Sequence, residues 1–142
     1  MNIYYLNKDS LPSIPNPHDC VIKRIEIKDR CIEFIFEDDI SYHDSIRCIQ
    51  PQARSLIMRY HFVCDKGLYE IYKWVRPKKP FEREGHYKRV KESDLPKLAE
   101  GKYKLEYLYH NVGYCSIITK LFSNGYIILD ADIDYVELEW IF

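Results

Sequence analysis

Residues 18–38, HDCVIKRIEIKDRCIEFIFED, alternate apolar and charged side chains around Asp29-Arg30, and this pattern predicts a β-hairpin. A two-residue turn at these positions fixes the register of the two strands. That register gives the ribbon one apolar face and one charged face, so one side suits a core and the other suits solvent. The predicted opposite pairs are Ile27–Ile32, Ile25–Phe34 and Lys23–Phe36.

Residues 54–64 fit two patterns. Their apolar positions match a helical stripe, but the alternation of Met58, Tyr60 and Phe62 with polar residues favours a strand. The run 68–75 after Gly67 is also β-like, and we predict that the two segments form a second hairpin.

Asn124-Gly125 is the preferred sequence of a two-residue hairpin turn, because both positions need a positive φ. The turn would pair Phe122 with Ile127 and Leu121 with Ile128. Both faces of residues 117–129 are largely apolar, so we expect this third hairpin to be covered on two sides.

The whole chain therefore predicts an all-β fold, an antiparallel sandwich or barrel built from hairpins, in a single domain over residues 1–142. One short helix is expected near residues 94–100, with Leu95 and Leu98 packing inward. Residues 40–49 are weakly patterned and are read as a strand. Further strands are expected at 2–6, at 103–110 with Tyr103, Leu105, Tyr107 and Tyr109 on one side, and at 135–142 with Phe142 in the core.

The chain has 21 basic and 22 acidic residues, so no overall charge draws it to nucleic acid or to a membrane. Its five cysteines are odd in number, lie in apolar patterns and form no CxxC pair, which indicates small buried side chains in a reducing compartment. No apolar run is long enough to span a membrane, and the first residues lack a signal-peptide pattern. We expect a cytoplasmic protein.

Residues 76–101 form a long stretch that we read as a basic loop, which a short strand at 86–90 would subdivide. Its cations alternate with Phe81 and Tyr87, and such a loop beside a β-barrel is typical of proteins that bind single-stranded nucleic acid. This is the alternative function. Its candidate residues are Arg76, Lys78, Lys79, Arg83, Lys88 and Arg89.

The region after Lys120 contains five acidic residues and no basic one. Asp130, Asp132 and Asp134 begin a calcium-loop pattern, but the glycine and the terminal glutamate of that pattern are missing, so we read them as an acidic turn between two strands. Together they would offer a carboxylate surface to a basic protein partner. The candidate partner-binding residues are Asp130, Asp132, Asp134, Glu137 and Glu139.

Two His-Asp pairs, His18-Asp19 and His43-Asp44, offer ligands that suit a metal ion, so a metal-dependent hydrolase is a third and weaker hypothesis. The alternative is structural, with Asp19 in a turn and His18 hydrogen-bonded to backbone. The sequence has no phosphate-binding loop and no nucleophile elbow. We predict no bound metal, no cofactor and no enzymatic activity.

The pattern PHDCVIKRIEIKDRCIEFIFED resembles a group of small bacterial proteins in which His-Asp, two residues and an aliphatic residue precede two alternating strands. Some members of that group look like immunity proteins of polymorphic toxin systems. The resemblance covers residues 18–38 and implies a β-rich bacterial protein that binds and blocks a toxin. Our leading prediction is therefore a non-enzymatic protein-binding module, with a toxin as the most concrete partner.

Overall fold

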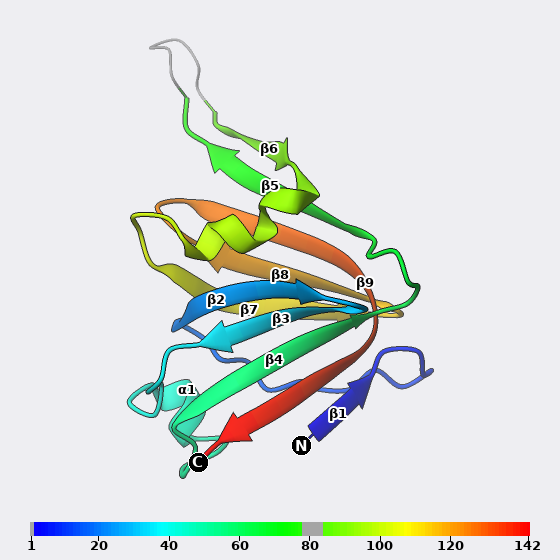
Figure 1. Cartoon of the computed structure of the whole chain (residues 1–142), viewed down its shortest axis with the longest axis vertical. Helices are drawn as coiled ribbons and strands as arrows, with labels where there is room; N and C mark the ends of the chain where they lie inside the picture. Colours follow the sequence, from blue (N-terminus) through cyan, green and yellow to red (C-terminus); the bar gives the residue numbers. More distant parts are fainter. Residues whose placement is uncertain (1, 78–83) are drawn as a thin grey trace.

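The computed structural model describes residues 2–77 and 84–142 and confirms the all-β prediction (Figure 1). In these residues nine strands belong to one antiparallel sheet, accompanied by two short helical segments. The elements in chain order are β1 (Asn2–Tyr5), β2 (Cys20–Lys28), β3 (Cys31–Phe36), α1 (Asp44–Arg47), β4 (Ser55–Phe62), β5 (Tyr69–Val75), β6 (His86–Val90), the 3₁₀-helix η1 (Glu92–Ala99), β7 (Leu105–Gly113), β8 (Ser116–Phe122) and β9 (Tyr126–Ile141).

The sheet closes on itself. Its order runs β4, β3, β2, β7, β8, β9, and β4 also pairs with β9, so these six strands form a ring. Contacts across the interior agree with closure, since the Tyr60 hydroxyl of β4 lies 2.8 Å from the Tyr107 hydroxyl of β7, a strand that is not its neighbour. Of the two architectures that the sequence left open, the fold is the barrel.

Strand β9 pairs with four other strands. It is 16 residues long, and its first half pairs with β8 and β5 while its second half pairs with β4 and β1. Two predictions were wrong here. Residues 130–134 continue the strand instead of forming an acidic turn, and β4 and β5 form no hairpin, because each pairs with a different part of β9 (Figure 1).

The predicted register of the first hairpin is largely confirmed. Ile27 faces Ile32 and Ile25 faces Phe34, but a bulge between Ile22 and Arg24 places Ile22, and not Lys23, opposite Phe36. The bulge adds one residue to β2 and so returns an apolar side chain to the interior.

The hairpin of β8 and β9 has a longer turn than predicted. Phe122 pairs with Tyr126, and Ser123 accompanies Asn124 and Gly125 in a three-residue loop. In the first half of β9 this register turns the even-numbered side chains outward. Ile118 of β8 and Tyr126 of β9 are exposed at 44% each. The outer face of this hairpin is therefore open, and the expected cover on its second side was wrong.

Further corrections concern local structure. Residues 40–49 contain helix α1 rather than a strand, and a bulge in β7 separates exposed Tyr109 from buried Leu105 and Tyr107. Tyr103 precedes the strand, and Phe142 is 72% exposed instead of being in the core. Only two cysteines, Cys20 and Cys31, are buried, while Cys48 and Cys64 are exposed.

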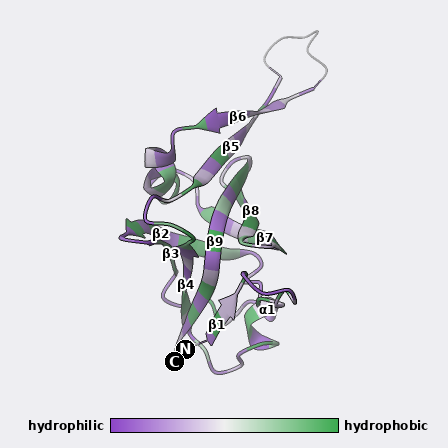
Figure 2. Ribbon diagram, turned by 90° about the vertical axis from the view of Figure 1, so that its right-hand side faces the viewer, coloured by the Kyte–Doolittle hydropathy of each residue, from purple (hydrophilic) through white to green (hydrophobic). Residues whose placement is uncertain are grey.

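The predicted strand at 86–90 and the short helix near 94–100 are confirmed as β6 and η1, so the described residues 84–101 are not all loop. Strand β6 pairs with β5 to form a ribbon that extends from the barrel, as Figures 1 and 2 show, and η1 follows it. Leu95 and Leu98 of η1 are buried, which confirms the predicted inward packing. Neither helical segment of the described residues has the length and apolar character required to cross a bilayer.

A chain of hydrogen bonds runs through the core. Burial lowers the pKa of His110, so its ring is neutral, and Nε2 donates to the carbonyl of Ile14 at 3.0 Å. Nδ1 then accepts from the Tyr107 hydroxyl at 2.6 Å, Tyr107 accepts from Tyr60, and Tyr60 accepts from Thr119 at 2.7 Å. Each buried hydroxyl thereby has partners, which avoids the cost of an unsatisfied polar group.

Candidate functional site

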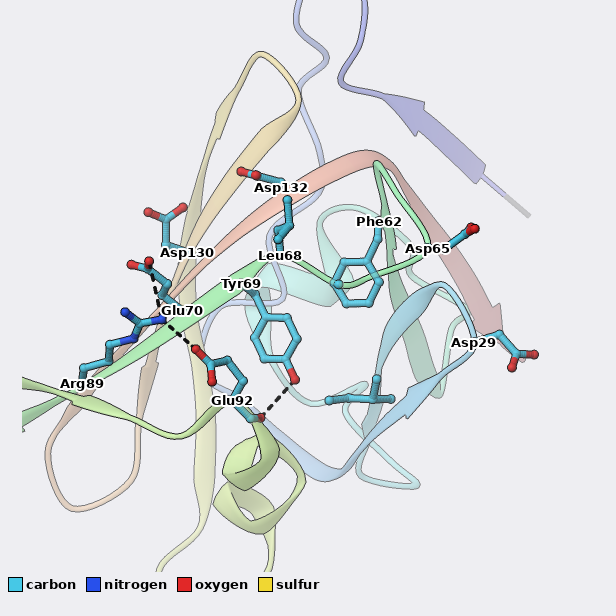
Figure 3. Close-up of a pocket in the computed structure, with 12 residues that line it drawn as sticks. Asp29, Phe62, Asp65, Leu68, Tyr69, Glu70, Arg89, Glu92, Asp130 and Asp132 are labelled. Atoms are coloured by element: carbon cyan, nitrogen blue, oxygen red, sulfur yellow. Dashed lines mark hydrogen bonds and ion pairs between the residues drawn. The ribbon is translucent and has the colours of Figure 1, made fainter.

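The candidate site is a surface cavity of about 780 Å³ at the end of the barrel where the chain leaves β4 and enters β5 (Figure 3). We call it the acidic groove. Four regions far apart in the sequence build it, namely the β2–β3 hairpin turn, the end of β4 with the start of β5, the end of β6 with the start of η1, and the middle of β9. Its lining includes one guanidinium, that of Arg89, and six carboxylates, those of Asp29, Asp65, Glu70, Glu92, Asp130 and Asp132.

The centre of the groove is apolar. Phe62 and Tyr69 stack with their ring centroids 5.8 Å apart and an interplanar angle of 11°. Leu68 and Ile27 lie beside them and are 54% and 41% exposed, which is high for large aliphatic side chains. Figure 3 shows the two rings between a group of carboxylates near Arg89 and a second group at Asp29 and Asp65. The groove thus has an apolar centre and acidic ends.

Local strand geometry explains why the carboxylates meet. Asp130 and Asp132 alternate with buried Leu129, Ala131 and Ile133, so the period of two in β9 turns both carboxylates outward. Glu70 of β5 stands opposite Asp130 in the ladder, which brings these two acids together on the outer face.

The electrostatic field around Asp130 and Glu70 is negative. Burial, together with the charges of Asp132 and Glu70, raises the pKa of Asp130 above its ordinary value. Arg89 offsets part of the charge, because its Nη2 donates to Glu92 at 2.8 Å and thereby lowers the pKa of that carboxyl. At the other end of the groove Asp65 pairs with Arg30. Six lining carboxylates against these two arginines still leave a site that would gain from an incoming positive charge.

The predicted partner-binding residues divide into two sets. Asp130 and Asp132 line the acidic groove. Asp134, Glu137 and Glu139 lie further along β9, outside it. Asp134 accepts from the side chain of Asn7 at 2.8 Å, and Glu137 is only 13% exposed and accepts from Arg59 at 2.7 Å. The structure therefore does not gather the five acids on one surface.

Arg59 is the centre of a partly buried ion-pair cluster on the barrel wall. It is 18% exposed, and it stands between Glu33 of β3 and Glu137 of β9, with both carboxylates 2.7 Å from its guanidinium. Burial alone would raise the pKa of Glu33, but hydrogen bonds from Arg59 and Lys28 outweigh it, and the pKa lies below its ordinary value. His61 contacts the other oxygen of Glu137 at 3.0 Å. This cluster holds three strands together.

The predicted nucleic-acid residues also separate. Lys88 and Arg89 line a cavity of about 850 Å³ over one face of the β5–β6 ribbon, together with Lys73, Lys91 and Lys97. Arg76 lines this cavity and a second one on the other face. Lys78, Lys79 and Arg83 lie outside the described residues.

The His18-Asp19 pair has structural contacts, whereas His43 Nε2 is buried and has no hydrogen-bond partner among the described residues. His18 contacts the carbonyl of Leu108 through Nδ1 at 2.5 Å, as the structural reading predicts, and its Nε2 lies 3.3 Å from Asp19. His43 packs against Tyr42 with ring centroids 4.2 Å apart and an interplanar angle of 34°, and it precedes helix α1. Among residues 2–77 and 84–142 no cluster of three or more His, Cys, Asp or Glu side chains is placed to hold a metal ion.

Sequence reasoning missed most of the groove. Phe62, Leu68 and Tyr69 looked like ordinary strand residues, and Glu70 and Glu92 are single acids in mixed surroundings. The available signal was the alternation of aspartates with buried residues in 129–133, which marks a strand with an acidic face. Comparisons of the chain with protein-family models, with curated proteins and with solved structures gave no match.

Proposed function

We propose that this chain is a non-enzymatic binding module whose acidic groove takes a basic, partly apolar segment of a protein partner. The observation that carries the proposal is the combination of exposed Leu68 and Ile27 with surrounding carboxylates in one cavity. Exposed apolar side chains ringed by polar ones are typical of protein-binding sites.

The chemistry of the groove selects the partner. An arginine or lysine stem can lie along Leu68 and Tyr69 while its cation meets the carboxylates of Asp130 or Asp132. An acidic surface also accelerates the encounter with a basic protein and disfavours acidic ones. The concrete form of the proposal is an immunity protein of a bacterial cell that blocks a basic toxin, the role that the resemblance of residues 18–38 implies.

A defined peptide tests the groove. A fluorescent peptide of alternating arginine and leucine should bind the wild-type protein at low salt, as measured by anisotropy. The double change Asp130→Lys/Asp132→Lys should weaken this binding by at least about tenfold, because like charges would then face each other. Leu68→Ser should weaken it too, since the apolar contact is lost.

The matched control is Asp38→Lys/Asp44→Lys. It makes the same change in net charge at two carboxylates that are 88% and 89% exposed and lie beyond the other end of β3. We expect this variant to retain most of the affinity. Equal weakening in both double variants would mean that the peptide senses only net charge, and it would refute the groove.

A further inference from the structure

A second surface lies on the outer face of the β5–β6 ribbon and the β8–β9 hairpin. Its cavity of about 420 Å³ shares no lining residue with the acidic groove. Four aromatic side chains and two cations line it, namely Trp74, Tyr87, Phe122, Tyr126, Arg76 and Lys120. We call it the aromatic face.

The four rings form a row across four strands. Trp74 pairs with Tyr87 in the β5–β6 ladder, and Phe122 pairs with Tyr126 in the β8–β9 ladder. The pairing of Lys73 with Ile127 brings the two halves of the row together. The row ends at β7, where Glu106 stands opposite Phe122. The four rings therefore lie side by side along one line on the outer face of the sheet.

The rings are open to solvent yet fixed in position. Trp74, Tyr87 and Tyr126 are 38%, 37% and 44% exposed. Trp74 and Tyr87 meet edge to face with centroids 5.1 Å apart, and a Cβ added to Gly85 would lie 2.4 Å from the indole of Trp74. The glycine therefore lets the backbone of the ribbon approach the indole closely.

The cations are placed beside the rings. Lys120 Nζ lies 4.4 Å from the centre of the Tyr126 ring. Arg76, the residue that follows β5, lines the same cavity. The described lining includes no carboxylate. Aromatic rings with adjacent cations suit a ligand that carries flat bases and regularly spaced anions.

We infer that the aromatic face binds single-stranded nucleic acid, with bases stacked on Trp74 and Tyr126 and phosphates held by Arg76 and Lys120. Duplex is disfavoured, because its bases are already stacked on each other and cannot reach the rings. The cations that line the opposite side of the ribbon, among them Lys73 and Lys88, add a long-range electrostatic attraction for the nucleic acid.

The test uses a labelled oligothymidine of about ten nucleotides and a duplex of equal length at low salt. Anisotropy should report binding of the single strand in preference to the duplex, and Trp74→Ala or Tyr126→Ala should weaken it by roughly tenfold each. Tyr114→Ala, at a 66% exposed tyrosine in the β7–β8 turn, should leave it unchanged. Lys120→Ala should reduce the slope of log affinity against log salt by about 0.7.

A spectroscopic readout avoids dependence on the folding of these variants. In a Trp140→Phe protein the only tryptophan is Trp74, and its emission should fall when oligothymidine is added. Absence of binding, unchanged Trp74 emission or equal affinity for duplex would each overturn the inference. Such a failure would leave the acidic groove untouched, because a peptide and not an oligonucleotide tests it.

Discussion

Replacing Arg59 with methionine should lower the free energy of unfolding by about 2–3 kcal/mol, at or just below the range for removing one partner of a fully buried ion pair, because the cluster is partly buried. The guanidinium serves both Glu33 and Glu137, and without it two carboxylates of low exposure lose their main hydrogen bonds. Lys28 and His61 still contact them, which keeps the cost from being larger. Urea unfolding at neutral pH measures the change.

The same variant should alter the dependence of stability on pH. In the wild type the pKa of Glu33 lies below its ordinary value of 4.5, so the stability it contributes is present above that pH and is lost as the pH falls through the lower folded value. In Arg59→Met the hydrogen bond and charge of Arg59 no longer lower this pKa, so it lies higher than in the wild type, and acidification should cost the variant less stability than it costs the wild type.

Arg30→Met is the control for the arginine cluster. Arg30 pairs with Asp65, but the two side chains are 66% and 82% exposed, so its loss should cost less than about 1 kcal/mol. Equal losses for Arg59→Met and Arg30→Met would show that the Arg59 cluster does not bind the strands of the barrel together.

Tyr60→Ala should lower the free energy of unfolding by about 3–5 kcal/mol, because it removes a ring from the centre of the core. Tyr60 is fully buried, its ring packs 4.9 Å from that of Phe34, and its hydroxyl connects Tyr107 with Thr119. For a domain of ordinary stability this loss approaches complete unfolding. Thermal and urea unfolding followed by circular dichroism would measure it.

Tyr60→Phe separates the ring from the hydroxyl. It keeps the packing but leaves the hydrogen bonds of Tyr107 and Thr119 incomplete, for which we expect a loss of about 1–3 kcal/mol. A Phe variant as unstable as the Ala variant would mean that the hydrogen-bond chain, and not the packed ring, stabilises the core. Losses below about 1 kcal/mol in both would contradict the position of Tyr60 inside a closed barrel.

Local patterns in the sequence predicted individual strands well and their partners less well. The hairpin at Asp29-Arg30 was predictable because turn and alternation lie within a few residues of each other. The pairing of β4 with β9 joins Arg59 to Glu137, which are far apart in the chain, and no local pattern carries that information. Glu137 therefore looked like a free surface acid, although it is an ion-pair partner.

The length of β9 was missed for a physical reason. Aspartate is disfavoured in strands and common in turns, so three aspartates in 130–134 indicated a chain reversal. The strand tolerates these aspartates because Asp130 and Asp132 point to solvent while the residues between and beside them are buried in the core. Both proposed surfaces depend on this strand, since Asp130 and Asp132 line the groove and Tyr126 lies on the aromatic face.

The most direct test of the proposed function is capture of a partner from nuclease-treated lysate of the source organism with three baits. These are the wild type, the groove variant Asp130→Lys/Asp132→Lys and the control Asp38→Lys/Asp44→Lys, read by mass spectrometry. The groove proposal predicts one basic protein that the wild type and the control retain in stoichiometric amount and that the groove variant loses. Equal recovery of that protein by all three baits would contradict it.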